Sequence, residues 1–174
     1  KILITYKSTN DGDEKKTVEV SPIKLVMRID TLYLIAADDS FPETQIFKNY
    51  LVENIINFTP LNVSTVPLKV PFSVEDHYKY AFGKYVSQED PQIVSLLIKT
   101  GWLKTQFLKS RFSPNAEILE DNDKNMIVNL KIRLTPDFKT WLFGVLPDVK
   151  ILKPESLKLE MIEKLKLTLK EMKA

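Results

Sequence analysis

The chain has 174 residues, of which 44% are hydrophobic and none is cysteine, and its formal net charge is +2. This length fits one large or two small domains, and the composition is that of a globular protein. The lack of cysteine excludes disulfides, thiolate metal sites and cysteine nucleophiles, and fits a reducing compartment, so we expect a cytoplasmic protein. No apolar run approaches the ~18 residues of a membrane span, so no membrane partner is expected.

The most informative stretch runs from residue 21 to residue 38. Its first half alternates between an apolar face and a more polar face, which predicts a half-buried strand. The apolar face consists of Ile23, Leu25, Met27 and Ile29, and the other face of Lys24, Val26, Arg28 and Asp30. Residues 32–37 are apolar on both faces, as in a strand buried on both sides. With a short connection at Asp30–Thr31, the stretch is predicted to form a β-hairpin.

Strands are also predicted at residues 2–7, 17–20 and 45–50, and residues 51–57 are predicted to be helical or irregular. Five short strands joined by polar turns indicate a small β-barrel over residues 1–58. Residues 59–72 contain three prolines and no helical period, which is typical of an extended linker.

A second domain is predicted over residues 73–174. A helix capped by Ser73 extends to about Gly83, with Asp76 three residues after the cap. Strands at 93–98, 117–120, 126–134 and 148–152 then alternate with helices at 102–108, from Thr135 and at 154–172. This β-α-β-β-α-β-α order predicts an α+β sandwich with helices on one face of the sheet. The predicted fold class is therefore α+β, a small barrel followed by a sandwich.

Catalytic chemistry is not indicated. His77 is the only histidine and lies in a predicted helix without a visible partner, so we interpret it as a solvated or partly buried helix residue. The four glycines do not form a phosphate loop, and no Gly-x-Ser-x-Gly motif is present. Asp121 and Asp123 fit a hairpin turn better than a calcium loop. We predict that the chain is not an enzyme and uses no cofactor or metal.

Several segments, in the same order, resemble a WYL domain, which is named for a Trp-Tyr-Leu triplet. Ser21-Pro22-x-x-Leu25 followed by residues 32–36 (Leu-Tyr-Leu-Ile-Ala) is similar to the core of that family. Residues 4–8 are similar to its first strand, and residues 48–55 to its Arg-x-aromatic-x-x-Asp-Arg-Ile segment. Residues 143–157 resemble the C-terminal extension, of the WCX type, that accompanies WYL domains in bacterial transcriptional regulators. The resemblance implies an Sm-like or SH3-like barrel.

A ligand site is predicted on the first domain. Lys24 and Arg28 share the polar face of one strand, Tyr33 lies on the next strand, and Lys48 with Tyr50 lies one strand further. Cations interleaved with aromatic rings suit a nucleotide or a single-stranded nucleic acid. The alternative is that the cations are solvated and the tyrosines pack in the core.

The resemblance extends this site. It implies that Ser8, Tyr33 and Lys48 match polar and basic residues of the family. It also implies that Arg111 belongs to a basic segment of the extension; the alternative is that this segment is only a surface loop. Leu32 replaces the family's Trp and Asn54 its second Arg, so the pocket is either altered or no longer senses a ligand. The predicted ligand-binding residues are Ser8, Lys24, Arg28, Tyr33, Lys48 and Arg111.

The predicted function is that of a ligand-sensing and dimerising region of a bacterial transcriptional regulator. The chain begins without Met directly at a strand, so we expect it to be a fragment of a longer protein. The resemblance implies that a helix-turn-helix that contacts duplex DNA would precede Lys1. The last helix carries an apolar stripe that either packs on its own sheet or forms a homodimer. The stripe consists of Met161, Ile162, Leu165, Leu169 and Met172. The alternative function is a structural dimerisation module with a degenerate ligand pocket.

Overall fold

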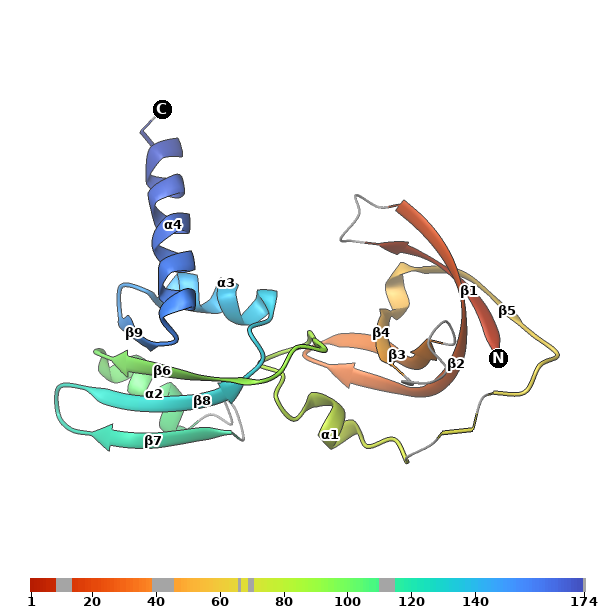
Figure 1. Cartoon of the computed structure of the whole chain (residues 1–174), viewed down its shortest axis with the longest axis horizontal. Coiled ribbons are helices and arrows are strands. Elements are labelled where there is room, and N and C mark those ends of the chain that lie inside the picture. The colour runs from red at the N-terminus through yellow and green to blue at the C-terminus, as the bar shows by residue number, and fades with distance from the viewer. Residues whose placement is uncertain (9–13, 39–45, 66, 69–70, 110–114, 174) are drawn as a thin grey trace. The chain divides into compact units, whose positions relative to one another are not determined.

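The computed structural model describes residues 1–8, 14–38, 46–65, 67–68, 71–109 and 115–173. The chain divides into two compact units, Lys1–His77 and Tyr78–Ala174, and each is built on its own antiparallel sheet (Figure 1). The sequence prediction had placed the division in the linker 59–72. No helix in the described ranges is long and apolar enough to cross a membrane.

The first unit is a five-stranded antiparallel sheet in the order β4-β3-β2-β1-β5. Its elements are β1 (Ile2–Ser8), β2 (Glu14–Arg28), β3 (Thr31–Asp38), β4 (Phe47–Leu51), the 3₁₀ turn η1 (Val52–Asn54) and β5 (Ile55–Pro60), and the short helix α1 (Val74–Tyr78) follows. The prediction that residues 51–57 are helical or irregular is wrong beyond residue 54, where β5 begins. In the hydrogen-bonded order β4 and β5 are the two edges of the sheet, so a closed Sm-like barrel is not confirmed.

The long strand β2 gives this sheet its curvature. Residues 14–20 of β2 pair with β1 on one edge, and residues 20–28 pair with β3 on the other. A bulge between Pro22 and Lys24 falls within the second half, and bulges increase bend and twist. The concave side of the curved sheet holds the core of this unit, and its buried members are Ile4, Val20, Leu34, Ala36 and Tyr50.

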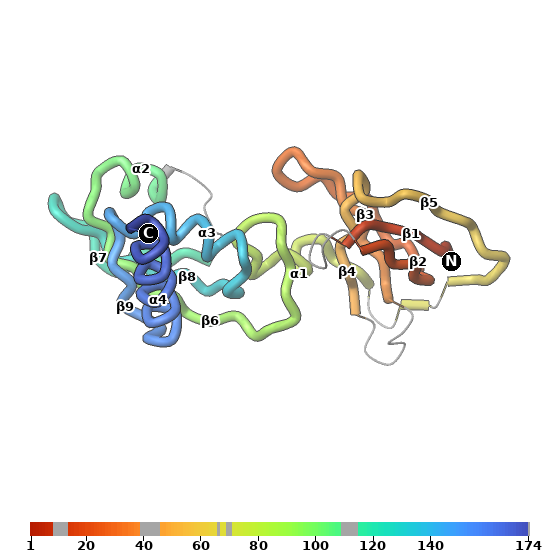
Figure 2. Tube along the Cα trace, turned by 90° about the horizontal axis from the view of Figure 1, so that it is seen from above, coloured from red at the N-terminus to blue at the C-terminus, as the bar shows by residue number. Residues whose placement is uncertain are grey.

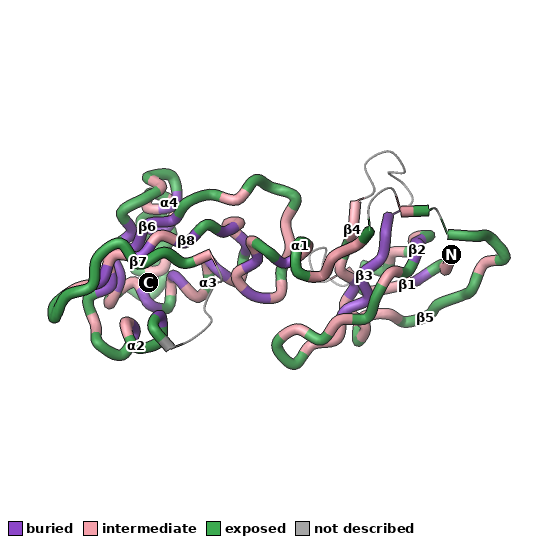
Figure 3. Tube along the Cα trace, turned by 90° about the horizontal axis from the view of Figure 1, so that it is seen from below, coloured by how far each residue is buried: buried purple, intermediate pink, exposed green. Residues whose placement is uncertain are grey.

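Strand β3 is buried on both faces, as its sequence predicted (Figure 3). Leu34 and Ala36 belong to the concave core. On the convex face, Ala37 pairs with Phe47, whose ring lies 5.0 Å from Phe72 of the segment before α1. The convex face is therefore covered at this end by residues that were predicted to form the linker and the next helix.

The apolar face of the β2–β3 hairpin is exposed, although its alternation predicted a half-buried strand. Leu25, Met27 and Ile29 are 59%, 64% and 67% exposed. The reason is that β1 pairs with β2 only as far as Val20, and the hairpin projects beyond it (Figure 2). The turn lies at Ile29–Asp30, one residue earlier than predicted, and both residues have positive φ angles of 45° and 58°, as a type I′ turn requires.

The second unit has the strand order β7-β8-β6-β9 and confirms the predicted β-α-β-β-α-β-α succession. Its elements are β6 (Gln92–Ile98), α2 (Gly101–Lys109), β7 (Ala116–Asp121), β8 (Met126–Ile132), α3 (Pro136–Val145), β9 (Val149–Lys153) and α4 (Glu155–Glu171). Through β9 this is the β-α-β-β-α-β pattern of ferredoxin-like domains. Alternate residues of β8, among them Val128 and Leu130, are buried in one core with residues of all three helices, such as Leu103, Phe138 and Leu157.

Helices α1 and α4 differ from the simple expectation. Helix α1 ends at Tyr78 rather than near Gly83, although Ser73 Oγ does cap it by accepting a hydrogen bond from Asp76 N at 3.1 Å. Helix α4 is buried only at Leu157 and Met161. The rest of α4 extends beyond its sheet (Figure 1), so the apolar stripe predicted on this helix is mostly exposed.

Candidate functional site

Three of the predicted ligand residues share the convex face of the first sheet. Residues directly opposite each other in an antiparallel pair point to the same side. Tyr33 lies opposite Val26, and Lys24 and Arg28 are each two residues from Val26 along β2. The two cations therefore flank the tyrosine, with their Cα atoms about 13 Å apart along an extended strand.

The ring of Tyr33 is not available on that face. Tyr33 is only 8% exposed, whereas Lys24 is exposed and Arg28 is half-buried. The structure therefore brings two cations and a tyrosine together, but the phenol packs inside, which is the alternative that the sequence had left open. A base could not stack on this ring without a rearrangement.

Lys48 lies on the opposite, concave face, so the expected single surface is not formed. It is paired with Ala36, and its Nζ lies 2.5 Å from Asp38 Oδ2. The side chain of Asp38 is 5% exposed and that of Lys48 is 49% exposed. Lys48 therefore neutralises a buried carboxylate at the edge of the core.

Ser8 does not share the convex face with Lys24, Arg28 and Tyr33. Ser8 is the last residue of β1, opposite Glu14, and by strand alternation it falls on the same side as Ile4 and Tyr6. That side is the concave one. Arg111 lies outside the described residues.

Tyr50 belongs to the charged end of the concave core. Burial, together with the negative charge of Asp38 and the neighbouring Tyr6, raises the pKa of the Tyr50 hydroxyl well above its usual value. The rings of Tyr6 and Tyr50 meet edge to face at 5.3 Å. Tyr50 therefore remains a neutral packing residue at physiological pH.

His77 has a structural position. Its Nε2 lies 2.8 Å from Asn49 Oδ1 on β4, and its ring lies 5.3 Å from that of Phe72. This contact ties α1 to the convex face of the sheet. The interpretation of His77 as a partly buried helix residue is confirmed.

A basic and aromatic cluster that the sequence analysis missed lies in the second unit, around Tyr80. Three cationic groups approach its ring centroid: Lys131 Nζ at 5.4 Å, Lys79 Nζ at 5.6 Å and Arg133 Cζ at 5.7 Å. These distances are within the range of cation–π attraction. Within the described ranges, no carboxylate lies within 4 Å of any of the three cations. We call these four residues the Tyr80 cluster.

Hydrogen bonds to backbone carbonyl groups hold the Tyr80 cluster in place. Arg133 N donates to Tyr80 O at 2.9 Å, and Arg133 Nε donates to Glu89 O at 2.9 Å. Asn115 O accepts from Lys131 N at 3.1 Å, while the Asn115 side-chain amide donates to Lys79 O. Three like charges gathered near one ring repel each other unless an anion joins them, so the cluster is suited to a phosphate-bearing ligand.

Comparison with known proteins assigns the family. The two antiparallel sheets define a two-domain α+β protein. Residues 1–59 match the WYL domain family and residues 90–169 match the WCX domain family, so only residues 60–89 and 170–174 lie outside the two matches. The chain belongs to the WYL-domain proteins that carry a WCX domain, which confirms the resemblance found in the sequence.

Two solved structures are similar over nearly the whole chain. One is described as a CRISPR Cas-related protein, with a TM-score of 0.56 and 17% identity, covering 98% of this chain and 48% of that one. The other is proteasome accessory factor B/C (PafBC) of Arthrobacter aurescens, with a TM-score of 0.39 and 15% identity, covering 95% of this chain and 24% of that one. The first supports the fold alone. The chain spans about half of the first protein and a quarter of the second. A comparison with curated proteins found no match.

Proposed function

We propose that the chain is the ligand-sensing region of a bacterial, cytoplasmic transcriptional regulator and that its ligand is a nucleotide or a single-stranded nucleic acid. The succession of WYL and WCX domains supports a regulatory sensing role. Three parts of this proposal remain predictions: a closed Sm-like barrel, the lack of catalytic activity, and a DNA-binding segment elsewhere in the protein. Ligand binding would alter regulation only through a difference in affinity between two states of the regulator.

The Tyr80 cluster is the observation that carries the ligand class. A single-stranded nucleic acid needs cations for its phosphates and a ring on which a base can stack. Lys79, Lys131 and Arg133 provide the charge, and Tyr80 is half-buried rather than sealed inside a core. Lys24 and Arg28 on the first unit form a separate pair of cations, but Tyr33 beside them is buried.

Fluorescence anisotropy with a labelled ten-nucleotide single-stranded DNA tests this proposal at several salt concentrations. Each phosphate contact with single-stranded nucleic acid adds about −0.7 to the slope of log affinity against log salt. We therefore expect Lys131→Gln and Arg133→Gln each to make the slope less negative by about 0.7. Tyr80→Leu should cost about 1–3 kcal/mol of binding free energy, as expected for a lost base–ring stack, and leave the slope nearly unchanged.

Lys166→Gln is the matched control, because Lys166 is an exposed cation on α4, outside the cluster. It should bind like the wild type. A mononucleotide competitor separates a nucleotide ligand from a longer strand. No binding at low salt, or equal binding by the wild type and the cluster variants, would contradict the proposal.

A structural dimerisation module is the second candidate, and the exposed apolar residues of α4 favour it. Leu165, Leu169 and Met172 are 43%, 54% and 82% exposed, so the second half of the helix has apolar surface that a partner could bury. Sedimentation equilibrium should then show a dimer that Leu169→Glu weakens at least tenfold and the neighbouring Lys170→Glu weakens much less. A chain that sediments as a monomer at every concentration would exclude this candidate.

A further inference from the structure

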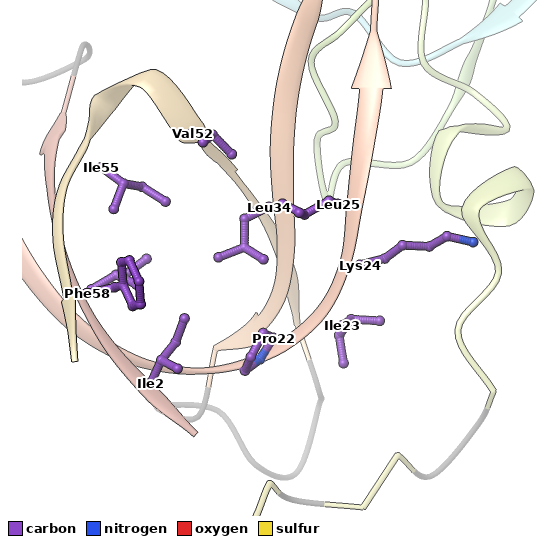
Figure 4. A pocket seen from close by; sticks show the side chains of 10 residues that line it. Ile2, Pro22, Ile23, Lys24, Leu25, Leu34, Val52, Ile55 and Phe58 are labelled. Carbon is purple, nitrogen blue, oxygen red and sulfur yellow. The ribbon is translucent and has the colours of Figure 1, made fainter. Parts of the chain in front are cut away.

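The concave side of the first sheet holds a cavity of about 580 Å³ that is open to solvent on one side. Its walls come from separate elements, with Ile2 and Ile4 on β1, Leu34 on β3, Val52 in η1, and Ile55 and Phe58 on β5. Figure 4 shows the side chains of Ile2, Leu34, Ile55 and Phe58 inside the curve of the sheet. We propose that this cavity, here called the concave cavity, binds a small molecule with an uncharged alkyl or aryl body. This site is separate from the Tyr80 cluster and does not depend on the proposed nucleic-acid ligand.

The chemistry of the walls sets the ligand class. Among the described residues that line the cavity, Lys24 is the only charged one, and its amine points away from the interior (Figure 4). On the concave side Asp38 and Lys48 neutralise each other, and Glu14 and Lys16, which pair with Ser8 and Tyr6, are not among the described residues that line the cavity. A charged ligand would therefore lose its hydration without gaining a counter-ion, which is costly. An apolar ligand gains free energy in proportion to the area it buries.

The size of the cavity favours a small molecule over a protein segment. Small-molecule sites typically measure roughly 300–1,000 Å³ and are lined mostly by apolar side chains. One turn of a helix about 10 Å wide and 5.4 Å in pitch occupies about 420 Å³. The cavity therefore has room for little more than one turn of a docked helix, and so short a helix is not stable by itself.

The cavity has an apolar mouth and a fixed floor. Phe58 is 64% exposed, and Leu25, which also lines the cavity, is 59% exposed. Exposed apolar rims of this kind mark ligand grooves. At the floor Ile4 is fully buried, and the next inward-facing residue of β1, Tyr6, meets Tyr50 edge to face. These contacts support the two walls, so the space is present before a ligand enters.

A register shift explains why β5 contributes two residues to this space. Ile4 pairs with Phe58 and Tyr6 with Ile55, so β5 has one extra residue between these two pairs. Ile55 and Phe58 consequently both face the concave side, although three positions separate them. A regular strand would have turned one of them outward.

The test uses the whole chain and N-phenyl-1-naphthylamine, an apolar aryl probe whose fluorescence rises in apolar surroundings. We expect saturable binding with one probe per chain. Straight-chain alcohols should displace the probe, with an affinity that rises about fourfold per added methylene until the cavity is full. Carboxylates of the same chain length should bind more weakly than the alcohols.

Two variants and one control locate the binding. Val52→Phe fills the cavity and should reduce probe affinity at least tenfold, and Phe58→Ala removes the exposed ring at the mouth and should reduce it several-fold. Leu3→Phe adds the same ring as Val52→Phe, but on the other face of β1, and should bind like the wild type. Circular dichroism checks that each variant is folded. If Val52→Phe fails to fold, Phe58→Ala decides the question, because Phe58 is mostly exposed.

Three results would overturn the proposal. The first is a wild-type chain that does not bind the probe. The second is equal binding by the wild type, Val52→Phe and Phe58→Ala. The third is a chain that sediments as a dimer and binds the probe only when dilution dissociates that dimer. In that case a second copy of the chain, and not a small molecule, would occupy the concave cavity.

Discussion

Replacing Lys48 with Met should destabilise the first unit, because it removes the cation that neutralises a buried carboxylate. Lys48 Nζ lies 2.5 Å from Asp38 Oδ2, and the Asp38 side chain is 5% exposed. Hydrogen bonds to charged groups contribute about 1.5–3 kcal/mol to stability. Since the Lys48 side chain is 49% exposed and water can partly replace it, we expect a loss near the lower end, about 1.5–2 kcal/mol. For a domain of this size that corresponds to a fall in Tm of roughly 6–16 °C.

Urea and thermal unfolding followed by circular dichroism measure this loss, with Lys24→Met as the control. Lys24 is an exposed lysine of the same sheet for which the structure describes no ion pair, so its change should stay within about 0.5 kcal/mol. Asp38→Asn in the Lys48→Met background should restore part of the stability. Equal effects of Lys24→Met and Lys48→Met, or a Lys48→Met variant as stable as the wild type, would refute the structural role of this pair. An unchanged affinity for single-stranded DNA would also separate Lys48 from the ligand site.

Three further predictions concern single residues. Ile29→Asn should raise the free energy of unfolding by about 1 kcal/mol in urea titrations, because a β-branched residue at a φ of 45° is strained and Asn tolerates that region; a less stable variant would contradict this. Stability of the wild type should fall above about pH 10 by up to about 1.4 kcal/mol per pH unit, because the Tyr50 phenol ionises in the unfolded chain while burial and Asp38 keep its pKa raised in the folded chain. Tyr50→Phe should lack this contribution, and a variant whose stability falls as steeply as that of the wild type would contradict the prediction. Met161→Ala should cost about 2–5 kcal/mol, whereas Leu165→Ala on the exposed part of α4 should cost under about 1 kcal/mol in the monomer; similar losses would contradict the division of α4 into packed and exposed halves.

The sequence predicted the second unit better than the first, for a physical reason. Its strands carry regular alternation, and in β8 the inward residues Val128 and Leu130 lie two positions apart. β5 was missed because its register shift breaks the period of two, so that Ile55 and Phe58 face the same side. Helix α1 ended early because Tyr80 O accepts a hydrogen bond from Arg133 N, a contact that local sequence does not reveal.

The predicted ligand site failed to form one surface because strand register cannot be obtained from residue types alone. Moving a strand by one residue reverses every side chain. Lys48 pairs with Ala36 and so faces Asp38, whereas Tyr33 and Lys24 face the other side. The Tyr80 cluster joins residues that lie about fifty positions apart, and the only local signal was the placement of two cations, two residues apart, at the end of a strand.

The two proposed sites differ in the physical origin of their binding free energy, and salt separates them. At the Tyr80 cluster, binding of single-stranded DNA releases counter-ions, so affinity falls steeply as salt rises. At the concave cavity, an apolar ligand gains free energy from desolvation, and strongly hydrated salts such as sulfate strengthen that gain. A sulfate titration should therefore weaken DNA binding while it preserves or strengthens binding of the apolar probe. If both ligands bind one chain, the factor by which each changes the affinity of the other must be the same in both directions. A measured factor of one would mean that the two sites act independently, and a larger or smaller factor would identify the coupling that a sensor requires.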